Sequence, residues 1–520
     1  MNRVAIQPLE QAYITSSPQA TVCALPANSK LFTTAMLLLL TLAAPLIHGY
    51  HVGIEDQGIY LPAVKQHLQP QLYSRDTELF APQTRPTLFD EAVAFSSQLT
   101  HLPLEATMLL WHLASIYLLL WGCLRIARRC FVSRRAQWVS VAMVAALLTL
   151  GVTGTGLSLV DEYLHPRTPA TALLLLMLID VLDRKLWRAI LWVGPAALLH
   201  IQMTFYALLL AGFFLLPGKW ISARLRSINP IAAALLLVNF SLLSLFQKGS
   251  EAWLEAARTR SSHYLLRWTW YEWLGIFGPM VFLWWYGRIG NRQNLSRLSF
   301  IARRLLLFAI FIFVVACIAT IPPAFERLTP YQPMRGFHLV YLFLVLLSGG
   351  LLGKFVLRRS VARWVLLFVP LSLAMFHAQR QLYAASSHIE LPEVAPQNRW
   401  LQAFDWVRHN TPADAYFAID PNYLDAPGND MHGFRALAER SVMADAIKDS
   451  GVVLLFPAIA ERWHNEVHAR ANWNQFRRAD FEKLRRDFGV DWVLISASHP
   501  AGGELSCPYA NEAVRVCHIP

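Results

Sequence analysis

The chain has 520 residues, of which 55% are hydrophobic and only 15% are charged, and its mean hydropathy is positive. Soluble domains are normally about one quarter charged, so this composition excludes an ordinary soluble protein. Several apolar runs, such as residues 31–50 and 303–321, reach the roughly 20 residues that cross the hydrocarbon core of a bilayer. The sequence therefore predicts a polytopic α-helical membrane protein.

The formal net charge of +12 raises the question of a nucleic-acid partner. The lysines and arginines, however, gather in short segments between the apolar runs, which is typical of loops on the cytoplasmic side of a membrane. These basic segments are residues 125–135, 183–188, 218–227, 288–304 and 353–363. The charge distribution therefore predicts the orientation of the chain in the membrane. The expected partner is membrane lipid and not nucleic acid.

The N-terminal residues 1–30 are polar and predict a cytoplasmic tail. No small-residue cleavage site follows the first apolar run, so we expect residues 31–49 to be a retained anchor. Residues 189–217 predict a hairpin of two short helices, broken near Pro195 and the polar segment that begins at His200, because this alone keeps every basic segment inside. The other spans are expected near 104–124, 137–157, 169–183, 229–246, 273–287, 301–320, 336–353 and 361–382.

This path gives about eleven transmembrane helices within a membrane domain of residues 31–383. The N-terminus is expected in the cytoplasm and the C-terminus outside. The loops expected on the extracytoplasmic side are residues 50–103, 158–168, 247–272 and 321–335.

The first outside loop carries Glu55 and Asp56 about six residues beyond the first span. An acidic residue here could cap the helix that residues 56–68 predict, since helix N-termini attract negative charge. Alternatively, partial desolvation beside the bilayer could raise the pKa of a carboxylate and make it a useful general base. The sequence leaves both interpretations open.

The second outside loop repeats the acidic pair, with Asp161 and Glu162 directly after the third span and with His165 and Arg167 before the fourth. Carboxylates that lie close to the lipid boundary in two loops exceed what solvation requires. They are therefore candidate functional residues.

Arg260, Arg267 and Arg335 lie on the outside, where the orientation rule disfavours arginine. Arginine binds phosphate through two parallel hydrogen bonds, so these residues could hold an anionic lipid headgroup. They could equally snorkel or pair with acidic neighbours such as Glu255 and Glu326. His200, inside the membrane hairpin, is open to a functional or a structural interpretation.

Residues 384–520 lose the apolar runs and predict a small extracytoplasmic α/β domain. We expect a helix over residues 399–412, strands over 415–420 and 491–496, and one long helix over 460–489 that ends at Gly489. Cys507 and Cys517 could form a disulfide in an oxidising compartment or remain free.

Four features together resemble the GT-C class of polyprenyl-phosphate-sugar-dependent glycosyltransferases. They are the acidic first loop "IEDQGIYLPAVKQHL", the acidic pair in "DEY", the split hairpin and the C-terminal outside domain. The resemblance covers most of the chain. More narrowly, the chain is similar to bacterial members of unassigned function, which carry text like "WVRHNTPADAYFAIDP", "GFRALAERSVMAD", "FGVDWVLIS" and an Arg–Ser–His segment as in "RTRSSHYLLRW".

This resemblance implies an enzyme of the bacterial inner membrane that transfers a sugar, with inversion, from a polyprenyl phosphate to an extracytoplasmic hydroxyl. The acceptor could be a glycan, a lipid or a protein. Asp56 would be the base, with Glu55 able to exchange roles, and Asp161 or Glu162 would place the acceptor or help Asp56 hold a divalent metal. No other cofactor is implied. The residues expected to bind the lipid phosphate are Arg167, Arg260, His263 and Arg335.

Two other classes of function remain open. A transporter or lipid flippase could use the same intramembrane histidine and outside arginines, although such proteins often have matched broken helices in internal repeats and this chain has one broken hairpin. A non-catalytic scaffold whose C-terminal domain binds a partner is also compatible with the fold. The carboxylates in both outside loops favour the enzyme.

Overall fold

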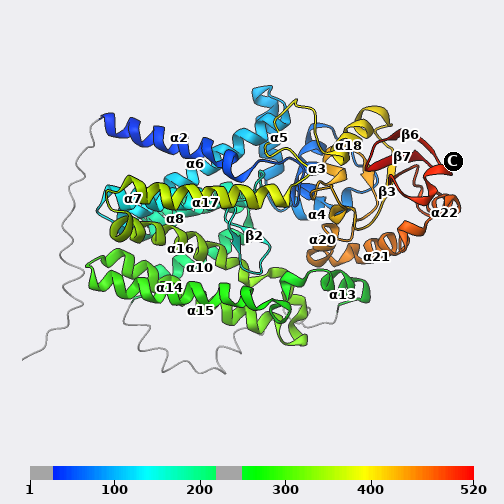
Figure 1. The fold of residues 1–520 in the computed structure, drawn as a ribbon. Coiled ribbons are helices and arrows are strands. Elements are labelled where there is room, and N and C mark those ends of the chain that lie inside the picture. Colours follow the sequence, from blue (N-terminus) through cyan, green and yellow to red (C-terminus); the bar gives the residue numbers. More distant parts are fainter. Residues whose placement is uncertain (1–26, 218–248) are drawn as a thin grey trace, which may run out of the picture.

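The computed structural model describes residues 27–217 and 249–520, arranged as a bundle of long helices with a sheet-containing domain at one end (Figure 1). The span expected at 229–246 and the basic segment at 218–227 lie outside the described residues. The bundle contains α2 (Ala27–His48), α6 (Leu104–Cys130), α7 (Arg134–Ala146), α8 (Arg167–Leu182), α9 (Leu186–Leu199), α10 (Ile201–Leu215), α14 (Trp270–Arg292), α15 (Ser296–Thr320), α16 (Phe337–Leu352) and α17 (Val361–Leu382).

Among the described residues, five helical segments are long and apolar enough to cross a membrane. The chain is therefore a membrane protein with several apolar helices, while the count of eleven spans stays a prediction. The five segments are Lys30–His48, Leu104–Cys130, Ser296–Thr320, Pro323–Leu357 and Val361–Leu382.

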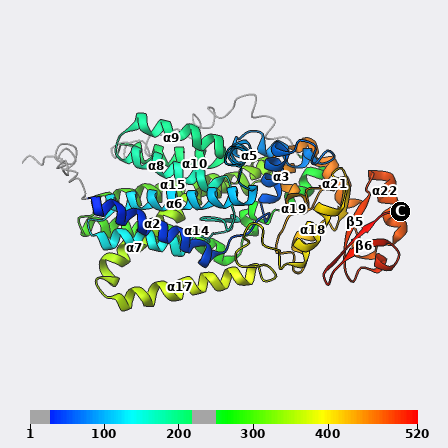
Figure 2. The ribbon, with the colours of Figure 1, turned by 90° about the horizontal axis from the view of Figure 1, so that it is seen from above.

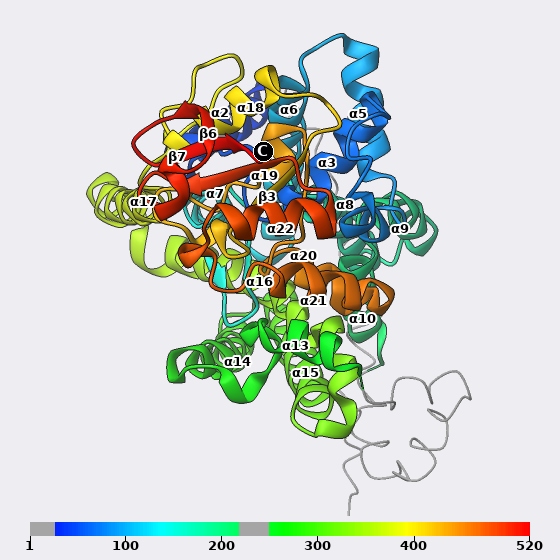
Figure 3. The same cartoon turned by 90° about the vertical axis from the view of Figure 1, so that its right-hand side faces the viewer.

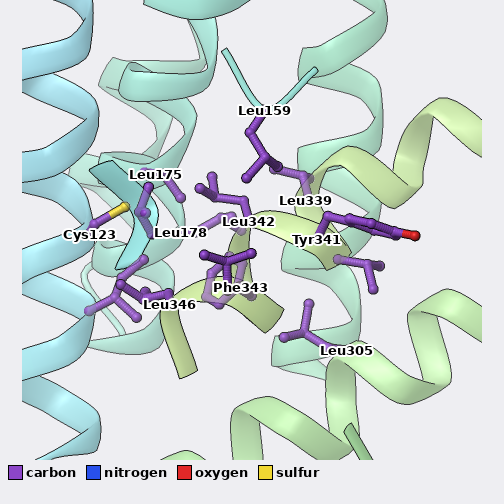
Figure 4. Packing of buried hydrophobic residues seen from close by; sticks show 14 of the residues in the cluster. Cys123, Leu159, Leu175, Leu178, Leu305, Leu339, Tyr341, Leu342, Phe343 and Leu346 are labelled. Atoms are coloured by element: carbon purple, nitrogen blue, oxygen red, sulfur yellow. The ribbon is translucent and has the colours of Figure 1, made fainter. Parts of the chain in front are cut away.

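The centre of the bundle is built around α16, which is apolar on all sides and is buried along most of its length. Figure 4 shows Phe343 and Leu346 of α16 packed near Leu175 and Leu178 of α8 and Cys123 of α6. A helix that is hydrophobic all round needs such enclosure by other helices or by lipid. The opposite case is α17, which lies at the edge of the bundle against α2 and α7 (Figure 2) and has no buried residue in its most apolar window.

The third expected span, 137–157, is wrong in its second half. Helix α7 ends at Ala146, and a short hairpin of β1 (Gly151–Val152) and β2 (Leu157–Ser158) follows. Gly154 and Gly156 have φ angles of 60° and 67°, a left-handed conformation that glycine adopts without steric cost. The turn-forming glycines therefore determine the structure of residues 151–158, although the composition of the segment is apolar.

The short helical hairpin at 189–217 is confirmed as α9 and α10, and the break lies at His200. The Nδ1 atom of His200 accepts a hydrogen bond of 3.3 Å from the backbone N–H of Met203 and so caps α10. Pro195, in contrast, stays within α9.

The loops that the sequence analysis expects outside, called the outside loops below, form short helices that cover one end of the bundle. The first loop contains α3 (Gln57–Leu68), η1 (Thr77–Leu79), α4 (Ala81–Thr84) and α5 (Phe89–Thr100). The later loops contain α13 (Glu251–Arg258), η3 (Ser261–His263), η4 (Leu265–Arg267), η5 (Pro323–Tyr331) and η6 (Pro333–Gly336), and the π-helical turn η7 (Gly353–Leu357) follows α16.

The C-terminal domain is built on a five-stranded sheet in the order β4-β3-β5-β7-β6. Strand β3 pairs in parallel with β4 and β5, and β7 pairs antiparallel with β5 and β6. The strands are β3 (Tyr416–Ile419), β4 (Ser441–Val442), β5 (Trp492–Ser496), β6 (Ser506–Ala510) and β7 (Val514–His518). The two expected strands are thus confirmed as β3 and β5.

The helices of this domain partly match the expected ones. Helix α18 is confirmed, whereas the long helix expected over 460–489 is divided into α21 and α22, with Asn472 in a left-handed conformation between them. Gly489, at φ 72°, ends α22 as expected. The domain contains α18 (Arg399–Asn410), η8 (Tyr423–Asp425), α19 (Phe434–Ala438), α20 (Asp449–Leu455), η9 (Pro457–Ile459), α21 (Ala460–His468), η10 (Trp473–Gln475), α22 (Arg478–Phe488) and η11 (Pro500–Gly503).

In the structure, a disulfide joins Cys507 of β6 to Cys517 of β7. It links the two strands at the outer side of the sheet, next to the C-terminus (Figure 3).

The first outside loop is bound tightly to the C-terminal domain. The backbone N–H of Gly433 donates to the carbonyl of Gly53 at 2.8 Å, and that of Glu55 donates to Met431 at 3.1 Å. Arg435, which is buried, donates to Asp76 of this loop at 2.7 Å. The domain therefore closes over the end of the bundle from which the first loop emerges.

Candidate active site

A cavity of about 1650 Å³ lies where the helical bundle meets the C-terminal domain. Its walls come from both acidic loops, the start of α10, the segment after α13, η6 and α20. All eight residues expected to carry catalysis or to bind the donor line this one cavity. They are Glu55, Asp56, Asp161, Glu162, Arg167, Arg260, His263 and Arg335.

Asp56 occupies the N-cap position of α3, yet its side chain makes no capping hydrogen bond. One carboxylate oxygen lies 3.2 Å from the ammonium of Lys448 and the other lies 3.3 Å from Nε2 of His165. Lys448 also contacts the carboxylate of Glu55, whose φ of 50° turns the chain just before the helix. The side chain of Asp56 therefore forms no capping hydrogen bond, although the residue lies at the helix N-terminus as the capping interpretation expects.

The hydrogen bonds of His165 fix which ring nitrogen carries its proton. Its Nδ1 accepts a hydrogen bond of 3.0 Å from the backbone N–H of Arg167, so a neutral ring carries its proton on Nε2. That Nε2–H faces Asp56. Asp56 is thereby held between a lysine of the C-terminal domain and a histidine of the second outside loop.

The charge state of Asp56 follows from these neighbours. Burial alone would raise the pKa of Asp56, but Lys448, His165 and Arg335 together hold it well below its usual value. The expectation of a raised pKa for this carboxylate is wrong, because the sequence did not reveal the cations around it. Asp56 is ionised at neutral pH.

The acidic pair of the second loop behaves differently. Both oxygens of Asp161 lie 2.6 Å from one guanidinium nitrogen of Arg167. Glu162, in contrast, lies 3.5 Å from the hydroxyl of Tyr383. Burial, reinforced by the charge of Asp161, raises the pKa of Glu162 to about 8. Glu162 is therefore protonated at neutral pH.

Two arginines of the cavity have unused hydrogen-bond donors. Arg335 donates from Nη1 to the side chain of Gln202 at 3.1 Å, while its Nε is buried and has no hydrogen-bond partner within the described part of the chain. The same is true of Nη1 of Arg167 among the described residues. Buried N–H groups are normally paired, so these two donors favour an anionic ligand in the cavity.

The other two expected donor-binding residues are turned towards the protein. Arg260 donates from Nη2 to the carbonyls of Ile447 and Lys448 and from Nε to the hydroxyl of Ser450 at 3.2 Å. His263 meets the side-chain amide of Gln332. Arg260 therefore holds in place the segment that carries Lys448.

Sequence reasoning missed Lys448, which lies in a polar segment of the C-terminal domain 392 residues beyond Asp56. It also missed Tyr383, Gln202 and Gln332. Lysine, tyrosine and glutamine are common on solvated surfaces, and their spacing in the chain gives no sign that they meet at one cavity.

Asp56 and Asp161 do not form a metal site in the described residues. Two groups of three side chains there have metal-binding spacing, and neither group includes either aspartate. Both carboxylates are engaged by cationic or imidazole side chains of the protein. In this structure both carboxylates are thus engaged by protein groups, and a divalent metal at Asp56 and Asp161 stays a prediction.

Comparison with known proteins gives one family match. Residues 398–449, which include Lys448, match a domain of unknown function, DUF6798. No curated protein matches the sequence. The matched stretch is a small part of the chain, so it does not assign a family to the whole protein.

The solved structures that are similar to most of the chain include two from one archaeon. The oligosaccharyltransferase of Archaeoglobus fulgidus, in complex with Zn and sulfate, is 13% identical with a TM-score of 0.47, covering 89% of this chain and 67% of that one. The oligosaccharyltransferase AglB from the same organism, with an inhibitory peptide and a dolichol-phosphate, is 12% identical with a TM-score of 0.44, covering 90% and 69%. Because both TM-scores lie below 0.5, the function has to be inferred from the residues of the cavity and not from this likeness.

Proposed function

We propose that this chain is an integral membrane glycosyltransferase that moves a sugar from a polyprenyl-phosphate donor to an extracytoplasmic acceptor hydroxyl. One observation carries the proposal: a single cavity at the end of the helical bundle contains an ionised carboxylate and two arginines with unused donors. Phosphate suits the arginines, and a hydroxyl acceptor suits the carboxylate. The bacterial inner membrane, with the cavity on its outer side, is part of the proposal.

The donor phosphate would lie between Arg167 and Arg335. The first turn of α10 contributes Ile201 and Phe205 to the same cavity, and both side chains are exposed. A lipid tail attached to the phosphate could follow this apolar side of the cavity into the bilayer, while the sugar remained near Asp56.

The transfer would be one displacement at the anomeric carbon of the sugar. The acceptor oxygen bonds to this carbon from the face opposite the phosphate, and the bond between the carbon and the phosphate oxygen breaks. The departing electron pair stays on the lipid phosphate, whose charge Arg167 and Arg335 neutralise. The hydroxyl proton passes to Asp56, so the configuration inverts and the lipid phosphate is released.

Lys448 and His165 would orient the carboxylate for this step. The low pKa of Asp56 makes it a weak base in the resting cavity, but the acceptor proton becomes more acidic as its oxygen bonds to carbon. Glu162 is protonated and would donate a hydrogen bond instead, which suits placement of the acceptor.

The proposal is tested by transfer of radiolabelled sugar from a panel of polyprenyl-phosphate sugars. The full chain is reconstituted in membranes, with a host extract as acceptor source, and Asp56→Asn is compared with wild type. Asp405→Asn, at an exposed position of α18, is the matched control. We expect donor consumption by wild type and the control and its loss in Asp56→Asn.

The remaining outcomes are equally informative. Equal consumption by Asp56→Asn and wild type would contradict the role of Asp56 and would direct attention to Glu55 or Asp161. Donor binding by wild type without consumption of any donor would contradict the enzyme and support the lipid transporter or the scaffold.

A further inference from the structure

Helix α13 precedes the segment that begins at Arg260 and lines the cavity. It faces α21 of the C-terminal domain (Figure 3). At their contact, Oε2 of Glu255 lies 2.8 Å from Nδ1 of His464, and Oε1 lies 2.8 Å from Nε2 of His468. The three possible ligand atoms lie within 4.8 Å of one another. This cluster is separate from the residues that line the cavity.

The chemistry of the three side chains fits a divalent metal of the zinc type. Zinc prefers imidazole nitrogen and carboxylate oxygen at about 2.0–2.2 Å, commonly with three protein ligands and one water. His464 and His468 are four residues apart, so both project from one face of α21, and their ring centroids are 4.2 Å apart. Nδ1 of His464 is buried and has no hydrogen-bond partner among the described residues, although it faces the carboxylate.

We propose that Glu255, His464 and His468 bind a zinc-type divalent cation that fastens α13 to α21. This proposal does not depend on the glycosyltransferase activity. The simpler rival is a pair of ion pairs between protonated histidines and Glu255, and a measurement of zinc binding separates the two.

The position of the cluster gives the metal a structural consequence. Trp253 of α13 is buried against the C-terminal domain and donates from its indole nitrogen to the carbonyl of Leu454 at 3.3 Å. Two residues after α13, Arg260 holds the carbonyl of Lys448. A metal at Glu255 would therefore strengthen a contact that also holds Lys448 near Asp56.

A second group in the described residues, His67 with Asp90 and Glu91, has similar spacing. It offers one imidazole, and its members lie on α3 and α5 of a single loop, so a metal there would not join the two domains. This group serves as an internal comparison for zinc binding.

The experiment uses the full chain in detergent after treatment with a chelator. Zinc binding is measured by equilibrium dialysis with metal analysis, and cobalt(II) replaces zinc for an absorption spectrum that reports nitrogen ligands. The test variant is His464→Gln with His468→Gln. The matched controls are His67→Gln and His409→Gln, the latter an exposed histidine that pairs with Asp405.

We expect wild type and both controls to bind one zinc per chain at this cluster and the double variant to lose that zinc and its cobalt spectrum. Zinc should also raise the thermal unfolding midpoint of wild type and slow hydrogen exchange in α13 and α20, and neither effect should occur in the double variant. Unchanged zinc binding in the double variant, or no binding by wild type, would overturn the site. Bound zinc without slower exchange in α13 would overturn the fastening role.

Discussion

Two loops, one with Glu55 and Asp56 and the other with Asp161 and Glu162, each bring an acidic pair to the cavity, but the structure places Asp56 and Glu162 in opposite electrostatic surroundings. Asp56 of the first loop is ionised because Lys448 and His165 contact it. Glu162 of the second loop has no such cation beside it among the described residues and is protonated, while Asp161 is neutralised by Arg167 only six residues away. Two adjacent carboxylates in a sequence therefore do not reveal their protonation states until their neighbours in the fold are known.

The sharpest test of this difference is the effect of amide substitutions on transfer. Asp56→Asn removes a proton acceptor and should lower the rate by about 10²–10⁴-fold, the usual contribution of a general base. Glu162→Gln replaces a group that is already neutral and should cost less than about tenfold. Initial rates at saturating donor check both, and equal losses in the two variants would erase the distinction between the loops.

The next effect concerns stability and the buried pair of the second loop. Arg167→Met leaves Asp161 without its partner, and loss of one member of a buried ion pair costs about 3–5 kcal/mol. The thermal unfolding midpoint in detergent should fall markedly. Replacing both residues, as Asp161→Leu with Arg167→Met, should recover much of the loss. A double variant as unstable as the single one would mean that the pair does more than neutralise charge.

Lys448→Met should raise the pKa of Asp56 towards the value expected from the sequence. Without the ammonium, burial acts with less opposition and the pKa of Asp56 rises. Since the base must be ionised, the acidic limb of the pH profile of kcat/KM should move to higher pH. Lys483→Met, which changes a lysine of α22, is the control. An unmoved limb would show that Asp56 does not set the pH profile.

The smallest effect is the pH dependence of stability from Glu162. Its pKa is about 8 in the fold against 4.5 ordinarily, so between these values the folded chain holds a proton that the unfolded chain releases. The unfolding free energy should thus fall as pH rises through this window, by up to about 1.4 kcal/mol per unit.

Glu162→Gln should remove this slope, whereas Glu512→Gln, at a residue whose side chain is 82% exposed, should keep it. Unfolding midpoints at pH 5 and 8 provide the measurement. Parallel pH curves for Glu162→Gln and wild type would contradict the raised pKa.

Much of the architecture was readable from the sequence because strong local signals agree with the fold. The buried run Tyr416–Ile419 forms a strand, and the helix after Asp56 begins where expected. The distribution of basic segments predicted that the loops with the acidic and basic candidates lie on one side of the membrane. In the structure these candidates line one cavity.

The failures have two physical causes: turns that interrupt a predicted helix, and contacts between distant segments. Helix α7 ends at Ala146, inside the predicted third span, and a hairpin that turns at Gly154 and Gly156 follows it, while Asn472 divides the predicted long helix. The charge state of Asp56 depends on Lys448, which reaches it only when the C-terminal domain docks. No local propensity encodes that docking.

The separation of 392 positions between Asp56 and Lys448 also implies a delay during synthesis. At about 5–20 residues per second of synthesis, roughly 20–80 seconds separate the appearance of the carboxylate from that of its lysine. During that interval the first loop has been synthesised, but the carboxylate of Asp56 lacks the ammonium of Lys448. The candidate site is thus incomplete until the last quarter of the chain has been synthesised.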